Sequence, residues 1–109
     1  MKTGAKDKDC CDAPLPKSLK GDPDEVLASF CKALGHPVRV RLVRILSSKG
    51  ECISGDLAEE FDLAQSTVSE HLRILKEASI IQGTIDGQRR CYCIHPGALQ
   101  LLRTLVDKL

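Results

Sequence analysis

The stretch LAQSTVSEHLRILKEA, residues 63–78, decides the fold of this chain. Its apolar residues Val68, Leu72 and Leu75 recur at the spacing of one helical face, which predicts a helix from about Gln65 to Ala78. At about 100° per residue, turning these three inward leaves four side chains facing directly outward and two on the flanks. The outward residues are Ser66, Glu70, Arg73 and Glu77, and the flanking ones are Thr67 and Ser69.

The residues on either side of this stretch predict a helix-turn-helix followed by a hairpin. Ser54 is placed to cap a short helix that ends before Asp62-Leu63-Ala64, a tight connection. After Ala78 the period changes, and the sequence predicts strands over 80–85 and 89–94 joined at Asp86-Gly87. The fold class is therefore mainly α with a β-hairpin wing, which is a winged helix-turn-helix.

Such a fold indicates DNA reading, because the second helix of the pair enters a major groove. Hydroxyl, amide and guanidinium groups on its outward side would contact bases and phosphates, and arginines near the hairpin tip would contact the backbone. Glu70 is unfavourable near phosphate unless it accepts a hydrogen bond from a cytosine amino group. His71 falls close to the apolar stripe, so packing competes with DNA contact there. The candidate DNA-binding residues are Gln65, Ser66, Thr67, Ser69, His71, Arg73, Arg89 and Arg90.

Three further helices are predicted around this unit. Asp22-Pro23 starts one, whose inner face includes Phe30 and Leu34 and on which Cys31 is predicted to lie in the core; Pro37 and Pro96 start the others. Residues 1–22 are polar and are predicted to form a flexible arm carrying Cys10 and Cys11, with the winged helix-turn-helix domain over 23–109.

Composition limits the function. The chain has 109 residues, of which 42% are apolar and 3% aromatic, and its formal net charge is +1. Any DNA-binding charge must therefore be local. The sequence has no membrane-spanning run and no signal peptide, so we expect a cytoplasmic protein. Six cysteines in a reducing compartment favour metal binding or redox chemistry over structural disulfides.

Three blocks of the sequence resemble the ArsR/SmtB family of metal-responsive repressors: KALGHPVR (32–39), LAQSTVSEHL (63–72) and LKEA (75–78). The resemblance covers about residues 24–108. It implies a winged-helix homodimer with its first and last helices at the interface, which binds operator DNA when metal-free and is released by a toxic ion. Family members often have Ser where this chain has Ala64, and Ala cannot cap the reading helix.

The resemblance also suggests where an inducer binds. Zinc sensors of the family use carboxylates and histidines on the last helix, but residues 96–109 contain no His and only Asp107. Some arsenic-responsive members have an N-terminal Cys-Cys pair and one cysteine near the position of Cys52. This implies a site for As(III) or Sb(III), soft ions that prefer three thiolates, at Cys10, Cys11 and Cys52, within or between subunits, with no organic cofactor.

Alternatives remain for the other cysteines. Cys91 and Cys93 lie on the same face of a strand, so they are candidates for a two-point site, for a redox pair, or for small apolar residues under the wing. A repressor of the same fold that responds to thiol redox state or persulfide is the alternative function. An enzyme is not expected, since no Cys-x-x-Cys lies at a helix start, no Ser/His/Asp set is expected to converge, and no glycine-rich phosphate loop occurs.

Overall fold

The computed structural model describes residues 14–49, 61–86 and 89–109, with the backbone alone described at 49, 84–86 and 89–91. The described elements follow one another as a short 3-10 helix, three helices, a hairpin and a last helix. They are η1 (Lys17–Lys20), α2 (Pro23–Ala33), α3 (Pro37–Lys49), α4 (Gln65–Glu77), β1 (Ile81–Asp86), β2 (Arg89–Ile94) and α5 (Pro96–Asp107). The mainly α fold with a two-stranded wing is confirmed. The short helix predicted after Ser54 falls at 50–60, outside the described residues.

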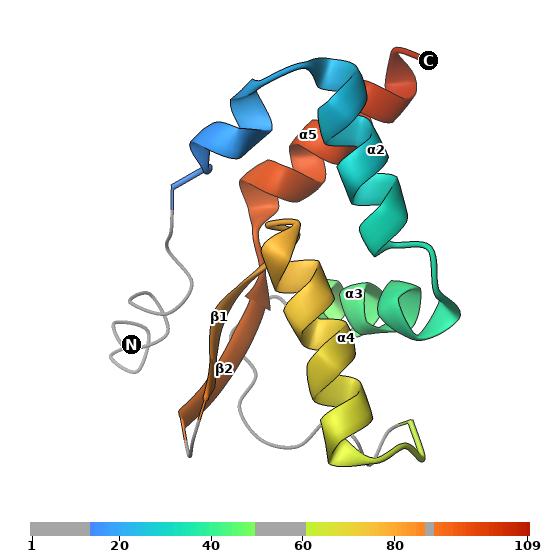
Figure 1. Ribbon diagram of the computed structural model, residues 1–109, viewed down its shortest axis with the longest axis vertical. Helices are drawn as coiled ribbons and strands as arrows, with labels where there is room; N and C mark the ends of the chain where they lie inside the picture. The colour runs from blue at the N-terminus through green and yellow to red at the C-terminus, as the bar shows by residue number, and fades with distance from the viewer. Residues whose placement is uncertain (1–13, 50–60, 87–88) are drawn as a thin grey trace.

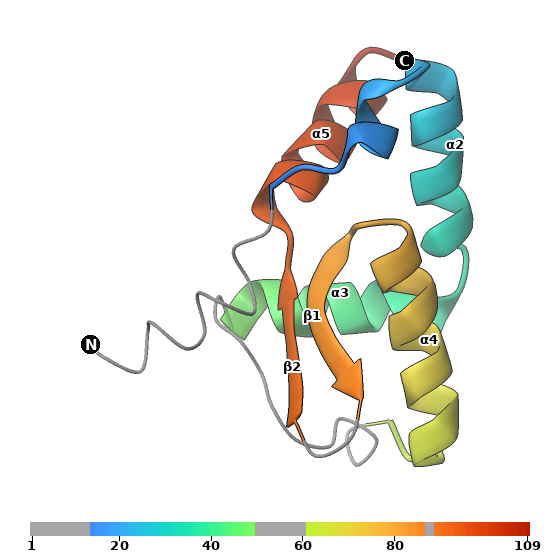
Figure 2. The ribbon, with the colours of Figure 1, turned by 60° about the vertical axis from the view of Figure 1, so that its left-hand side comes forward.

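The elements gather at two ends of the molecule. Figures 1 and 2 show α2 and α5 side by side at one end, while α3, α4 and the hairpin form the other. One apolar core joins the two ends, and its fully buried members come from α2, α3, α4 and the strands. They are Phe30, Leu42, Leu46, Leu72, Leu75, Ile80, Ile81 and Tyr92.

Helix starts follow the expected chemistry. The Asp22 carboxylate accepts a hydrogen bond from the Asp24 amide at 3.3 Å, with Pro23 in the first turn of α2. The helix α3 begins at Pro37, and α5 begins at Pro96. The α5 cap is His95, whose Nδ1 accepts from the Ala98 amide at 3.2 Å.

The reading helix α4 has unusual residues at both ends. Ala64 has extended backbone at the N-cap, and only its carbonyl serves the helix, accepting from Thr67 at 3.0 Å and Val68 at 3.1 Å. At the other end Ser79 adopts φ 68°, a left-handed conformation that favours glycine. The amides of Ser79 and Ile80 then bond to Lys76 and Leu75 at 2.9 and 3.1 Å, which closes a Schellman motif.

The hairpin register fixes the wing on the core. Ile81 pairs with Ile94, Gly83 with Tyr92, and Asp86 with Arg89, and the two residues between the strands, 87 and 88, lie outside the described residues. The Ile80 carbonyl accepts from the His95 amide at 3.0 Å. The base of the wing is therefore hydrogen-bonded directly to the start of α5.

Two sequence predictions need correction. The segment before α2 is not a free arm throughout, because Lys17–Lys20 form η1 and the Leu19 side chain is buried against α2. Cys31 is exposed rather than in the core. Its neighbour Phe30 takes the fully buried position, and one residue is a rotation of about 100°, which carries Cys31 to the rim of the α2 surface.

Candidate nucleic-acid interface

The helix α4 presents a polar face to solvent, opposite its buried stripe. Val68, Leu72 and Leu75 are between 0% and 2% exposed, which confirms the stripe. Among the predicted DNA-binding residues of this helix, Ser66, Thr67 and Arg73 are exposed, and Gln65, Ser69 and His71 are half-buried. The hydroxyls of the first turn and the Arg73 guanidinium therefore share one accessible surface at the N-terminal half and middle of α4.

Arg73 lies between two carboxylates of the same helix. Its Nε donates to Glu70 Oε1 at 3.1 Å, and its two terminal nitrogens bond to Glu70 Oε2 and Glu77 Oε2. All three side chains are more than half exposed. The hydrogen bond from Arg73 lowers the pKa of the Glu70 carboxyl from its ordinary value of 4.5, and the two carboxylates raise the pKa of Arg73. The pairing therefore favours the charged forms of Glu70 and Arg73.

His71 lies against α3 and the residues before it. Arg39 Nη1 donates to His71 Nδ1 at 3.1 Å, since a guanidinium has no acceptor. The His36 ring is tilted by 44° against the His71 ring, with 4.6 Å between centroids. Arg39 Nε also bonds to the Ala33 carbonyl, so this cluster joins the end of α2, the start of α3 and α4. His71 therefore packs against Arg39 and His36 in the structure, while its contact with DNA stays a prediction.

The environment of His71 keeps its ring neutral. Burial is the main cause that lowers the pKa of His71 below 6.5, and the neighbouring His36 and Arg39 lower it further. A neutral Nδ1 is what the Arg39 hydrogen bond requires. No local sequence pattern indicates this cluster, because Arg39 and His71 are 32 residues apart.

The second functional contact that sequence reasoning missed lies at His95. Because Nδ1 accepts from the Ala98 amide, the neutral ring carries its proton on Nε2, which faces the Pro14 carbonyl at 3.4 Å. A Cβ built on Gly97 would lie 3.3 Å from the His95 ring and 3.5 Å from Leu15, so the segment lies close to the α5 N-terminus. Pro14 and Leu15 are thereby docked where β2 meets α5.

The predicted wing contacts and metal ligands largely lie outside the described residues. This applies to Cys10, Cys11 and Cys52, and to the side chains of Arg89, Arg90 and Cys91. Cys93 is 6% exposed and disulfide-bonded, while Cys31 is a free, exposed thiol. Among the described side chains, no group of three or more His, Cys, Asp or Glu is placed to hold a metal ion.

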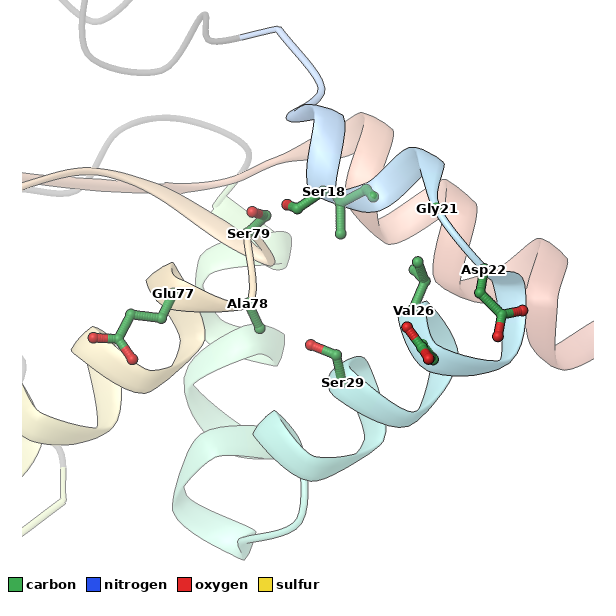
Figure 3. Close-up of a pocket in the computed structure, with 10 residues that line it drawn as sticks. Ser18, Gly21, Asp22, Val26, Ser29, Glu77, Ala78 and Ser79 are labelled. Atoms are coloured by element: carbon green, nitrogen blue, oxygen red, sulfur yellow. The ribbon is translucent and has the colours of Figure 1, made fainter.

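Two open concavities flank the α2 helix. One, of about 290 Å³, lies between η1, α2 and the end of α4, and is lined by serines and by acidic residues including Asp22 and Glu25. Figure 3 shows Ser29 and Ala78 at its mouth and the Glu77 carboxylate extending away from it. The other is an apolar groove of about 560 Å³ between α2 and α5, lined by Cys31, Leu34, Leu102, Arg103, Val106 and Asp107. Neither presents a basic surface suited to phosphate.

Comparison with known proteins agrees with this geometry. Residues 36–82 match the sequence profile described as "Bacterial regulatory protein, arsR family". An uncharacterised HTH-type transcriptional regulator of Methanocaldococcus jannaschii is 32% identical over 85 residues, which cover 78% of this chain and 96% of that protein. The chain belongs to the arsR family. The transcriptional repressor SdpR of Bacillus subtilis is 35% identical to this arsR-family chain over 63% of it and 76% of the repressor.

A solved structure described as a possible transcriptional regulator for arsenical resistance is also similar. It shares 34% identity and a TM-score of 0.64 over 73% of this chain and 82% of that one. These likenesses confirm the ArsR/SmtB resemblance and the winged helix-turn-helix fold. The arsR-family chain is thus a DNA-binding transcriptional regulator rather than an enzyme. None of the helices in the described part of the chain is both long and apolar enough to cross a membrane.

Proposed function

We propose that the chain is a cytoplasmic, homodimeric repressor that binds double-stranded operator DNA through α4 and the wing. The polar, accessible face of α4 is the observation that carries this proposal. His71 acts from behind that face by holding α4 against Arg39. The residues proposed to contact DNA are Gln65, Ser66, Thr67, Ser69 and Arg73 on α4, with Arg89 and Arg90 on the wing.

We further propose that As(III) or Sb(III) is the inducer, bound by the thiolates of Cys10, Cys11 and Cys52. Three sulfur donors suit these soft ions. The docking of Pro14 on His95 supports the proposal, because Cys11 is three residues from Pro14 and so lies within about 11 Å of it. A ligand on the cysteine pair therefore acts close to the wing and α5. The arsenical-resistance description of the similar structure favours the same class of inducer.

The homodimer in this proposal uses the α2–α5 end of the molecule. Leu102 is half-buried, and Val106 is 48% exposed beside Leu34, in the apolar groove between the two helices. A small domain with few aromatic residues has a thin hydrophobic core, and pairing two such faces in a dimer buries additional apolar surface. Sedimentation equilibrium is expected to give twice the 11.9 kDa chain mass, and replacing Val106 by Glu should shift the protein to monomer.

The decisive experiment follows operator release. Fluorescence anisotropy of labelled operator is measured while arsenite is added, for the wild type, for the double variant Cys10→Ser/Cys11→Ser and for Cys31→Ser. Cys31 is a control for the loss of a thiol, because it is a free cysteine outside the proposed metal site, although it lines the groove of the proposed dimer. We expect arsenite to release the wild type and Cys31→Ser but not the double variant.

Other results would redirect the proposal. Equal release of all three proteins would remove the tail pair from the site and leave Cys52 and the wing cysteines. Retention of all three on DNA at saturating arsenite would refute the arsenic proposal. Antimonyl tartrate in the same titration separates Sb(III) from As(III) by the concentration needed for half release.

A second function, a repressor that responds to thiol redox state or persulfide, is favoured by one observation. Cys93 is buried and disulfide-bonded at the base of the wing. Forming such a bond from two thiols gives two electrons and two protons to an oxidant such as peroxide. The redox switch predicts that peroxide releases the operator, that dithiothreitol restores binding, and that Cys93→Ser abolishes both effects while arsenite does nothing.

A further inference from the structure

The Glu70–Arg73–Glu77 cluster extends from the middle to the C-terminal end of the exposed α4 face that would enter the groove. Glu70 is held at both carboxylate oxygens by one guanidinium, and Glu77 holds the same guanidinium from the next turn. With two carboxylates around one cation, the cluster has a net negative charge. A reading helix gains most of its non-specific affinity from cations near phosphates, and this cluster gives the opposite charge.

The bidentate pairing fixes where the Glu70 carboxylate points. A carboxylate has about four lone-pair positions, so Glu70 can accept another hydrogen bond while it stays paired with Arg73. Its depressed pKa keeps it ionised, and an ionised carboxylate only accepts. Among the base edges of the major groove, guanine offers acceptors, thymine offers an acceptor and a methyl group, and adenine has an acceptor beside its amino group. Only cytosine offers an amino donor without a neighbouring acceptor.

We propose that Glu70 is a specificity-determining residue that accepts a hydrogen bond from the amino group of a cytosine in each operator half-site, with Arg73 as the residue that positions it. Where another base occupies that position, the Glu70 carboxylate faces acceptors and phosphates with no base donor to bond, and binding is opposed. The cluster thus lowers the affinity for non-operator DNA and increases the ratio of operator to non-operator affinity. This inference rests on the proposed placement of α4 in the major groove.

A matched pair of variants tests it. Glu70→Gln and Glu77→Gln each remove one carboxylate partner of Arg73 and change the net charge by the same amount, at exposed positions of one helix. Only Glu70 lies at the level of the reading hydroxyls, between Ser66 and Arg73. Wild type, both variants and Arg73→Ala are each used, without inducer, to select from a library of duplexes with a randomised core, and the bound fraction is sequenced.

The expected outcome separates base reading from plain charge. In the wild type, one C·G pair per half-site is preferred over T·A by about tenfold or more in affinity. Glu70→Gln reduces that preference below about threefold or moves it to adenine, which a Gln side chain reads with two hydrogen bonds. Glu77→Gln keeps the preference, and both variants bind scrambled DNA more tightly than the wild type.

Two results would overturn the inference. The first is equal change in Glu70→Gln and Glu77→Gln, which reduces the effect to charge alone. The second is an unaltered preference in Glu70→Gln. If Glu70→Gln and Arg73→Ala both keep the wild-type motif and affinity, the placement of α4 in the groove is wrong, and the inference is wrong with it. If Arg73→Ala alters the motif or the affinity and Glu70→Gln does not, α4 reads DNA without Glu70. Because no inducer is present, neither result depends on the arsenic proposal.

Discussion

The contact of His95 with Pro14 and Ala98 leads to a quantitative prediction about stability. His95 is 6% exposed and Ala98 is 0% exposed, so the Ala98 amide has no access to water if its acceptor is removed. A buried donor without a partner costs about 1–3 kcal/mol, and an N-cap is worth about 1 kcal/mol on its own. Since these two figures overlap, replacing His95 by Ala should lower the free energy of unfolding by about 2–3 kcal/mol.

A second substitution at the same position separates the two hydrogen bonds. Asn is among the best N-cap residues, so His95→Asn keeps an acceptor for the Ala98 amide. It is too short to reach the Pro14 carbonyl, a bond worth about 0.5–1.5 kcal/mol. His95→Asn should therefore be more stable than His95→Ala by at least about 1 kcal/mol, while its residues 14–20 become more accessible to a protease.

Urea denaturation followed by circular dichroism measures both values, at one protein concentration because dimerisation couples to stability. Limited trypsin digestion at Lys17 and Lys20 reports on the docked segment. The reasoning is refuted if the Ala and Asn variants lose the same free energy of unfolding. It is also refuted if tryptic cleavage at these lysines is no faster in His95→Asn than in the wild type.

Four further outcomes are expected. Ala64→Ser should raise the free energy of unfolding by about 1 kcal/mol in urea titrations, because it supplies the missing cap of α4. Ser79→Gly should raise it by about 0.5–1 kcal/mol, since glycine adopts φ 68° without steric cost but has more conformational freedom to lose. Arg73→Ala should weaken operator binding in anisotropy titrations and leave the thermal midpoint nearly unchanged, as exposed ion pairs contribute little stability. The pKa of His71 is lowered from 6.5 by folding, so below pH 6.5 the unfolded chain binds more protons than the folded one. The free energy of unfolding should therefore fall as the pH is lowered from 6.5 to the pKa of His71 in the folded protein. His71→Gln should reduce that fall, as measured by urea midpoints.

Local patterns in the sequence were sufficient to predict the reading helix α4 and the two strands of the wing. The stripe of Val68, Leu72 and Leu75 predicted a helix over 65–78, and the observed α4 is Gln65–Glu77. The strand predicted over 89–94 is observed with the same bounds, and the preceding strand is displaced by one residue. These features depend on neighbours within a few residues, where periodicity and turn chemistry carry most of the information.

Tertiary partners were not predictable in the same way. His95 contacts Pro14 across 81 residues, and neither residue has a periodic pattern that indicates the pairing. Leu19 is the one buried side chain among the described residues of the polar segment before α2, so composition alone predicted a flexible arm. Cys31 was predicted to be buried and is exposed, because the helical spacing of Phe30 and Leu34 does not show how wide the buried face of the helix is. The Arg73 pairs, in contrast, follow from i,i+3 and i,i+4 spacing.

In the proposed mechanism, the contact between Pro14 and His95 means that an inducer needs to alter only a small part of the structure. In the proposed mechanism, a ligand on Cys10 and Cys11 acts on a chain that is attached at Pro14 to His95. His95 directly follows β2 and caps α5, so one residue connects the arm to the wing and to the proposed dimer helix. Allosteric coupling in regulators is typically about 1–3 kcal/mol, or about 5–150-fold in affinity. The two hydrogen bonds of His95 are worth about as much, so in the proposed mechanism their loss on inducer binding would be large enough to match a coupling of this size.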